Sequence, residues 1–151
     1  MEIKEKYNEL KDKYNLPSFE ELDACFEISN IEDKNLLRGI RKKIAEKIDF
    51  IHQVIEPFVQ PDNSFSSLHE IDVFLEDDRI KLMALYKKIM ILIRELVKLN
   101  LIQNEENDAK FVKGFYDEWK NMREEVLLMV EKAQSSWYGE DIKGFNIDYL
   151  G

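Results

Sequence analysis

Four acidic residues near the start of the chain have a spacing suited to binding a metal ion. Glu20 and Asp23 lie three positions apart, as do Glu46 and Asp49, so on a helix each pair would occupy one face within a single turn. Carboxylate oxygens are ligands that Mg²⁺ prefers, and four of them could hold the ion and leave positions for phosphate oxygens. In a chain with 31 Asp and Glu residues, however, such pairs also arise by chance as solvent-exposed acids.

The two acidic pairs resemble the motifs of all-α nucleotide pyrophosphohydrolases of the MazG kind, which carry Glu-x-x-Glu on one helix and Glu-x-x-Asp on the next. The resemblance is confined to these two motifs, and Asp23 stands where that family usually has Glu. It implies a Mg²⁺-dependent hydrolase with Glu20, Asp23, Glu46 and Asp49 as metal ligands. We keep that function as an alternative and expect solvated acids, with no metal and no cofactor.

The amino-acid composition narrows the remaining classes of function and of binding partner. The net charge of −9 disfavours nucleic acid and anionic membranes as partners, because phosphate contacts need a basic surface. Cys25 is the single cysteine, which excludes an intramolecular disulfide and a thiolate metal cluster. The first residues lack an apolar signal region, and the longest apolar run, residues 89–93, is too short for a membrane span. We therefore expect a cytoplasmic protein.

The most apolar segment lies between residues 78 and 99. Its apolar residues recur at steps of three and four, which is typical of a helix with one broad apolar face. They are Leu82, Leu85, Tyr86, Ile89, Leu92, Ile93, Leu96 and Leu99. A helix this apolar should be surrounded by others, so we expect residues 77–102 to be the central element of a helical bundle.

Similar periodicity predicts two further long helices, over residues 30–57 and 105–136. Capping patterns begin at Ser18, Ser29 and Ser67, and Asn104 is the expected N-cap of the last helix. They place short helices at about 19–27 and 68–75, and another covers 2–14. The sequence thus predicts an all-α fold, an antiparallel bundle of three long helices closed by short N-terminal helices. Residues 1–136 would form one domain, followed by a non-helical tail, 137–151.

Two groups of residues are candidates for binding a partner through exposed helix faces. Lys34, Arg38, Arg41 and Lys42 form a basic stripe, which we expect to be solvated unless it receives an acidic partner or the acidic tail. Ile80, Ala84 and Ile91 fall within the polar stripe of the apolar helix. Apolar residues aligned on a polar face often mark a covered surface. The cover could be another segment of this chain, a second copy or a different protein.

The tail is aromatic, acidic and interrupted by two glycines. Its apolar residues are too many for a solvated end, and they are Ile142, Phe145, Ile147, Tyr149 and Leu150. Such a segment could pack on the bundle as a strap or insert its side chains into a groove of a partner.

From these features we predict an interaction or scaffold protein that acts through its helix faces and its tail. The alternatives are the Mg²⁺-dependent hydrolase and a homodimer formed through Ile80, Ala84 and Ile91.

Overall fold

The computed structural model describes residues 2–139, which form six helices and no strand. The helices are α1 (Ile3–Tyr14), α2 (Phe19–Phe26), α3 (Leu36–Val59), α4 (Phe65–Ile71), α5 (Glu76–Leu101) and α6 (Glu105–Ser135). No helix within this range is both long and apolar enough to cross a bilayer. The all-α prediction is confirmed.

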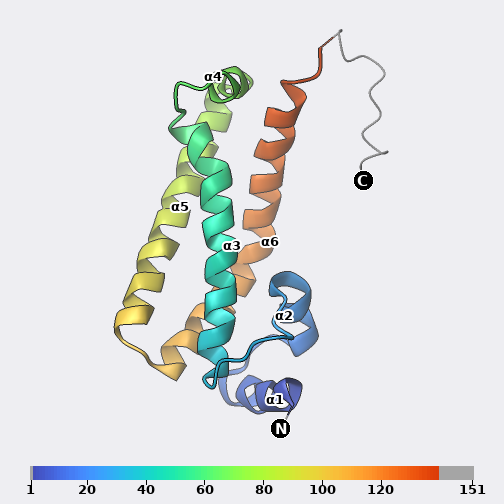
Figure 1. Ribbon diagram of the computed structural model, residues 1–151, viewed down its shortest axis with the longest axis vertical. Helices are drawn as coiled ribbons and strands as arrows, with labels where there is room; N and C mark the ends of the chain where they lie inside the picture. Colours follow the sequence, from blue (N-terminus) through green and yellow to red (C-terminus); the bar gives the residue numbers. More distant parts are fainter. Residues whose placement is uncertain (1, 140–151) are drawn as a thin grey trace.

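The three long helices pack side by side and alternate in direction, with α3 and α6 running one way and α5 the other (Figure 1). α3 is the central element, because it makes the most extensive contacts with both other long helices, α5 and α6, and also packs against α2 and α4. The expectation that residues 77–102 are central was wrong. Helix α5 buries one face against α3 and α6 and leaves its opposite face exposed, so its high apolar content does not mean that it is enclosed.

The short helices close the two ends of the bundle. α1 and α2 lie at one end, where the ring of Phe26 packs against Phe115 and Trp119 of α6 at centroid distances of 5.7 Å. α4 lies at the other end, beside the end of α3 and the start of α5 (Figure 1). Among residues 2–139, therefore, no helix packs on the side of α3 and α6 that lies between α2 and α4.

Two predicted N-caps are confirmed and two are wrong. Ser18 accepts from the Glu21 amide in a complete capping box, and Asn104 accepts from the Asn107 amide.

The two wrong N-caps shift the starts of two helices. α3 starts at Leu36 instead of residue 30, because Asn35 supplies the cap. Ser29 instead donates its amide and hydroxyl to Asp23. α4 covers residues 65–71 instead of 68–75, because the Ser64 side chain caps it and Ser67 donates its amide to that cap.

We expected the basic stripe of Lys34, Arg38, Arg41 and Lys42 to be solvated, but the structure differs from this expectation. Arg41 is buried, with 1% of its side chain exposed, and its Nε lies 2.7 Å from Asp108 Oδ1 at the start of α6. Arg38 binds the Asp33 carboxylate through Nε and Nη2. These two cations therefore fix the start of α3 to its neighbours and are not available to an acidic partner.

Candidate functional site

The four carboxylates of the hydrolase alternative each have a different local partner. Glu20 pairs with Lys4 (2.5 Å) and Glu46 with Lys43 (3.8 Å), whereas Asp49 accepts from Gln53 Nε2 (3.0 Å). Asp23 accepts the two hydrogen bonds from Ser29. Within residues 2–139, no three His, Cys, Asp or Glu side chains are grouped so that they could hold a metal ion. The structure therefore does not bring the four residues together as that alternative requires.

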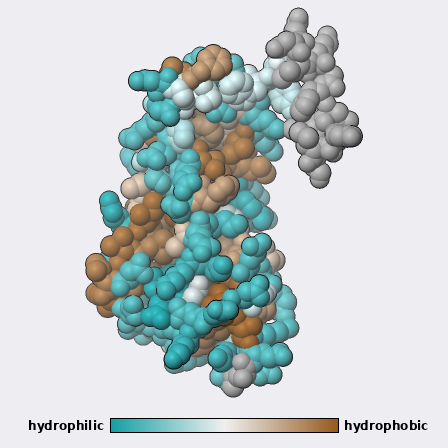
Figure 2. Space-filling model, in the orientation of Figure 1, coloured by the Kyte–Doolittle hydropathy of each residue, from teal (hydrophilic) through white to brown (hydrophobic). Residues whose placement is uncertain are grey.

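Ile80, Ala84 and Ile91 are exposed on the outer face of α5. The side chain of Ile80 is 63% exposed and that of Ile91 is 70% exposed, and no described segment covers them. The apolar atoms that Figure 2 shows along α5 lie mainly on its lower, C-terminal half. We call this face the α5 outer surface, defined by Arg79, Ile80, Met83, Ala84, Lys87, Ile91 and Arg94.

Three cations accompany these apolar residues. Arg79, Lys87 and Arg94 are exposed, and none forms an ion pair with residues 2–139. The neighbouring Lys88 and Lys98 are paired, with Glu118 (3.1 Å) and Glu95 (3.3 Å) respectively. The α5 outer surface is therefore apolar and basic in a chain whose net charge is −9.

The first turn of α5 is held in place by Asp78. The carboxylate of Asp78 accepts from the Leu75 amide (3.1 Å) and from Lys132 Nζ of α6 (2.5 Å). The hydrogen bond from Lys132 lowers the pKa of Asp78 below its usual value, and the hydrogen bond from Leu75 adds to this effect. Because this buried face is anchored to α6, Ile80 projects away from the bundle.

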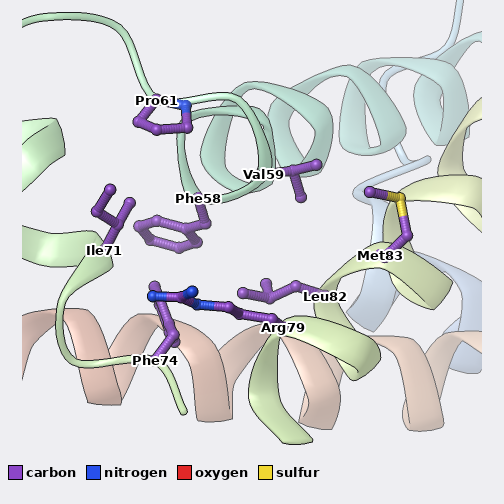
Figure 3. Close-up of a pocket in the computed structure, with 8 residues that line it drawn as sticks. All are labelled: Phe58, Val59, Pro61, Ile71, Phe74, Arg79, Leu82 and Met83. Atoms are coloured by element: carbon purple, nitrogen blue, oxygen red, sulfur yellow. The ribbon is translucent and has the colours of Figure 1, made fainter. Parts of the chain in front are cut away.

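A pocket of about 270 Å³ adjoins this surface where α3, α4 and α5 meet. Its walls are mainly apolar, and it is lined by Phe58, Val59, Pro61, Ile71, Phe74, Arg79, Leu82 and Met83. Figure 3 shows the Arg79 side chain lying along the pocket, beside the rings of Phe58 and Phe74. Arg79 and Met83 belong to both the pocket and the α5 outer surface, so the two features are continuous.

A second hollow, of about 370 Å³, lies between α3 and α6 on the side where none of the described helices packs. We call it the α3/α6 groove, and it is lined by Lys47, Phe50, Ile51, Val54, Trp119, Arg123, Val126, Leu127 and Val130. Figure 2 shows apolar atoms in this region between α3 and α6. Sequence reasoning missed both hollows. Their only sequence signal is the presence of apolar residues such as Phe50 and Leu127 beside the main apolar seams.

The predicted partner-binding residues of the tail, Ile142, Phe145, Ile147, Tyr149 and Leu150, lie outside the described residues. Ser136 and Trp137, which precede these residues in the chain, form hydrogen bonds with α4. His69 Nε2 donates to the Ser136 carbonyl oxygen (2.8 Å), and Trp137 Nε1 donates to Glu70 Oε2 (2.9 Å). The ring centroids of Trp137 and His69 are also only 4.3 Å apart. The chain therefore leaves α6 at the α4 end of the bundle.

Comparison with known proteins gives no match: no protein-family model, no curated protein and no solved structure shows significant similarity to this chain.

Proposed function

We propose that this protein is a protein-interaction module and that the α5 outer surface binds an acidic amphipathic helix of another protein. The observation that carries the proposal is the exposure of Ile80 and Ile91 beside cations that have no acidic partner within residues 2–139. Exposed apolar side chains in a row are costly in water, and a partner that covers them removes that cost.

The spacing on α5 favours a helical partner. Positions 80, 84, 87, 91, 94 and 98 follow one another at steps of four and three, the repeat of a helix that packs along another at a small crossing angle. This stripe lies opposite the buried face that contains Leu82, Leu85 and Ile89. Helix α5 thus has two apolar faces and uses only one of them inside the bundle.

Charge favours a different protein over a second copy of this one. Two α5 outer surfaces packed around a twofold axis near Lys87 would bring Lys87 close to its own copy and Arg94 close to other cations. Like charges in an interface oppose association, whereas Asp and Glu flanking an apolar stripe would pair with Arg79, Lys87 and Arg94.

The adjoining pocket supplies a place for an anchor residue. Binding energy in protein interfaces is concentrated in a few large side chains that fill pockets. A Phe or Leu of the partner would enter this pocket and pack against its apolar walls, with its backbone near Arg79 and Met83.

The test is site-specific photo-crosslinking of the full-length protein in cells of its natural host. A photoreactive residue replaces Ile91, and a control protein carries it at Phe65, which is equally apolar and 77% exposed but lies on α4. We expect an adduct from position 91 alone, in which the crosslinked segment of the partner is an acid-rich amphipathic helix. With that partner purified, Lys87→Glu should weaken binding about tenfold or more, and Lys120→Glu on α6 should leave it unchanged.

Three outcomes would overturn the proposal. One is the same adduct from positions 65 and 91, because the contact would then not be specific to α5. The second is an adduct between two copies of this chain, which would favour the homodimer. The third is a partner whose affinity is unaffected by Lys87→Glu.

A further inference from the structure

The α3/α6 groove is an apolar hollow without a cover in the described residues. Ile51 and Val54 of α3 face Val126 and Val130 of α6 across it. At its edges Phe50 is 62% exposed and Leu127 is 54% exposed. Exposed side chains of this size on both edges of a hollow are expected where another segment packs against them.

The groove also has a basic rim. Lys47 of α3 and Arg123 of α6 line it, and neither pairs with an acid in the part of the chain that the structure describes. An occupant that carries acidic residues beside its apolar ones would therefore be favoured by charge as well as by burial.

The chain outside the described residues begins close to this groove and is long enough to fill it. Val130 lines the groove, and α6 ends five residues later at Ser135. From Val130 to Trp119 the groove follows α6 for about 16 Å, at about 1.5 Å per residue. Residues 140–151 can reach about 40 Å when extended, at about 3.3 Å per residue. That reach exceeds the groove and the last turns of α6 together.

The sequence of this segment matches the groove in chemistry. Phe145, Ile147 and Tyr149 occur at every second position, so in an extended chain they would point to the same side. Glu140, Asp141 and Asp148 outnumber the single base, Lys143. The segment therefore carries apolar side chains for the floor of the groove and acids for its basic rim.

We propose that residues 140–151 bind in the α3/α6 groove of their own chain, with Phe145, Ile147 and Tyr149 on its floor and their acids toward Lys47 and Arg123. Because the segment is covalently attached at the adjacent end of α6, its effective concentration at the groove is on the order of millimolar, which favours it over a second copy. The proposal concerns a different face from the α5 outer surface, so either can fail without the other.

Disulfide crosslinking in the full-length chain tests the proposal. In a Cys25→Ala background, Leu127→Cys is combined in turn with Phe145→Cys, Ile147→Cys and Tyr149→Cys, and the proteins are oxidised with copper phenanthroline. The control series replaces Leu127→Cys with Ile91→Cys, a more exposed position on the opposite face of the bundle. A disulfide requires the two Cα atoms to approach within about 7 Å. We expect at least one groove pair to form a disulfide within the monomer about tenfold faster than its control.

The basic rim gives a second measurement on the same proteins. Arg123→Glu should slow formation of the groove disulfide severalfold, whereas Arg94→Glu on α5 should not change it. Equal rates in the two series would overturn the proposal, as would disulfides that join two chains instead of one. An unchanged rate in Arg123→Glu would overturn the role given to charge. Leu127, Ile91, Arg123 and Arg94 are exposed, and the half-buried Cys25 is replaced in both series, so its replacement does not distinguish the groove pairs from their controls.

Discussion

Arg41 and Asp108 form an ion pair in the interior of the bundle, and each side chain is only 1% exposed. Arg41 Nη1 also donates to Asn100 Oδ1 near the end of α5 (2.6 Å), so one guanidinium connects the three long helices. Burial raises the pKa of the Asp108 carboxyl, and the Arg41 guanidinium opposes that shift. Removing both charges from water costs free energy, so we assign to the pair the role of fixing how the helices align.

Breaking this pair should destabilise the protein strongly. Asp108→Ala leaves the Arg41 charge buried without its carboxylate, and we expect the free energy of unfolding to fall by about 3–5 kcal/mol, measured by urea denaturation. The double variant Arg41→Met/Asp108→Leu replaces both charges by apolar side chains, so it should recover part of that loss. A loss below about 1 kcal/mol in the single variant would show that water reaches Arg41.

Asp33 should make stability depend on pH in the acid range. Its hydrogen bonds from Arg38 lower the pKa of Asp33 to about 2, with a smaller contribution from the Asn35 amide. Since this is below the unfolded value of about 3.9, the stabilisation is complete above about pH 5 and is lost as the pH falls toward 2.

The variant Asp33→Asn isolates this contribution. We expect it to be less stable than the natural protein at pH 6, and the difference should shrink steadily between about pH 4 and pH 2, measured by urea denaturation at each pH. Glu118→Gln, which removes an exposed ion pair with Lys88, is the control and should show a much smaller dependence. A difference that stays constant across the range would contradict the assignment.

At the level of the helices, local signals predicted the elements better than their boundaries. Ser18 and Asn104 act as caps because the groups they bind are only three residues away. Ser29 has the same local pattern, but a contact with Asp23 uses its side chain and the helix begins at Asn35 instead. Which of two capping residues starts a helix depends on such tertiary contacts, and the sequence alone does not contain them.

The two helical glycines allow a test of packing against helix propensity. A Cβ on Gly39 of α3 would overlap Ile31 Cγ2 and lie 3.1 Å from Asp33 Cβ, because the loop before α3 crosses the helix there. Gly114 of α6 is exposed, and no atom of residues 2–139 outside its own helical backbone lies within 4 Å of such a Cβ.

We therefore expect the same substitution to have opposite effects at these positions. Gly39→Ala should lower the free energy of unfolding by about 1–3 kcal/mol, because the loop must move away. Gly114→Ala should raise it by about 0.5–1 kcal/mol through better helix propensity. Thermal and urea denaturation of the two variants measure this, and a stabilising Gly39→Ala would show that the loop is not packed on α3.

For the molecule as a whole, apolar periodicity was enough to predict an all-α bundle of three long helices but not which helix lies at its centre. α5 has more apolar positions than its neighbours cover, so Ile80 and Ile91 remain exposed, whereas α3 has a narrower seam that is buried along its length. The α3/α6 groove and the pocket at Arg79 arise where helices fail to cover one another. That property belongs to the assembled bundle and leaves little pattern in any single segment.

The charges on the α5 outer surface lead to a prediction about the state of association. Lys87 and Arg94 interrupt a stripe that otherwise contains Ile80, Ala84 and Ile91, so two copies that met along α5 would place cations together. We expect the natural protein to remain monomeric by sedimentation equilibrium at tens of micromolar. In the variant Lys87→Leu/Arg94→Leu the stripe becomes continuously apolar at heptad spacing. We expect this variant to self-associate, with a dissociation constant at least about a hundredfold lower than that of the natural protein.

The matched variant Lys113→Leu/Lys120→Leu on α6 adds the same apolar groups at the same spacing outside this stripe, and it should associate less. Strong self-association of the natural protein would contradict the prediction. It would also show that the cations on α5 do not keep two copies apart, and the homodimer would then replace binding of an acidic partner as the better account of this surface.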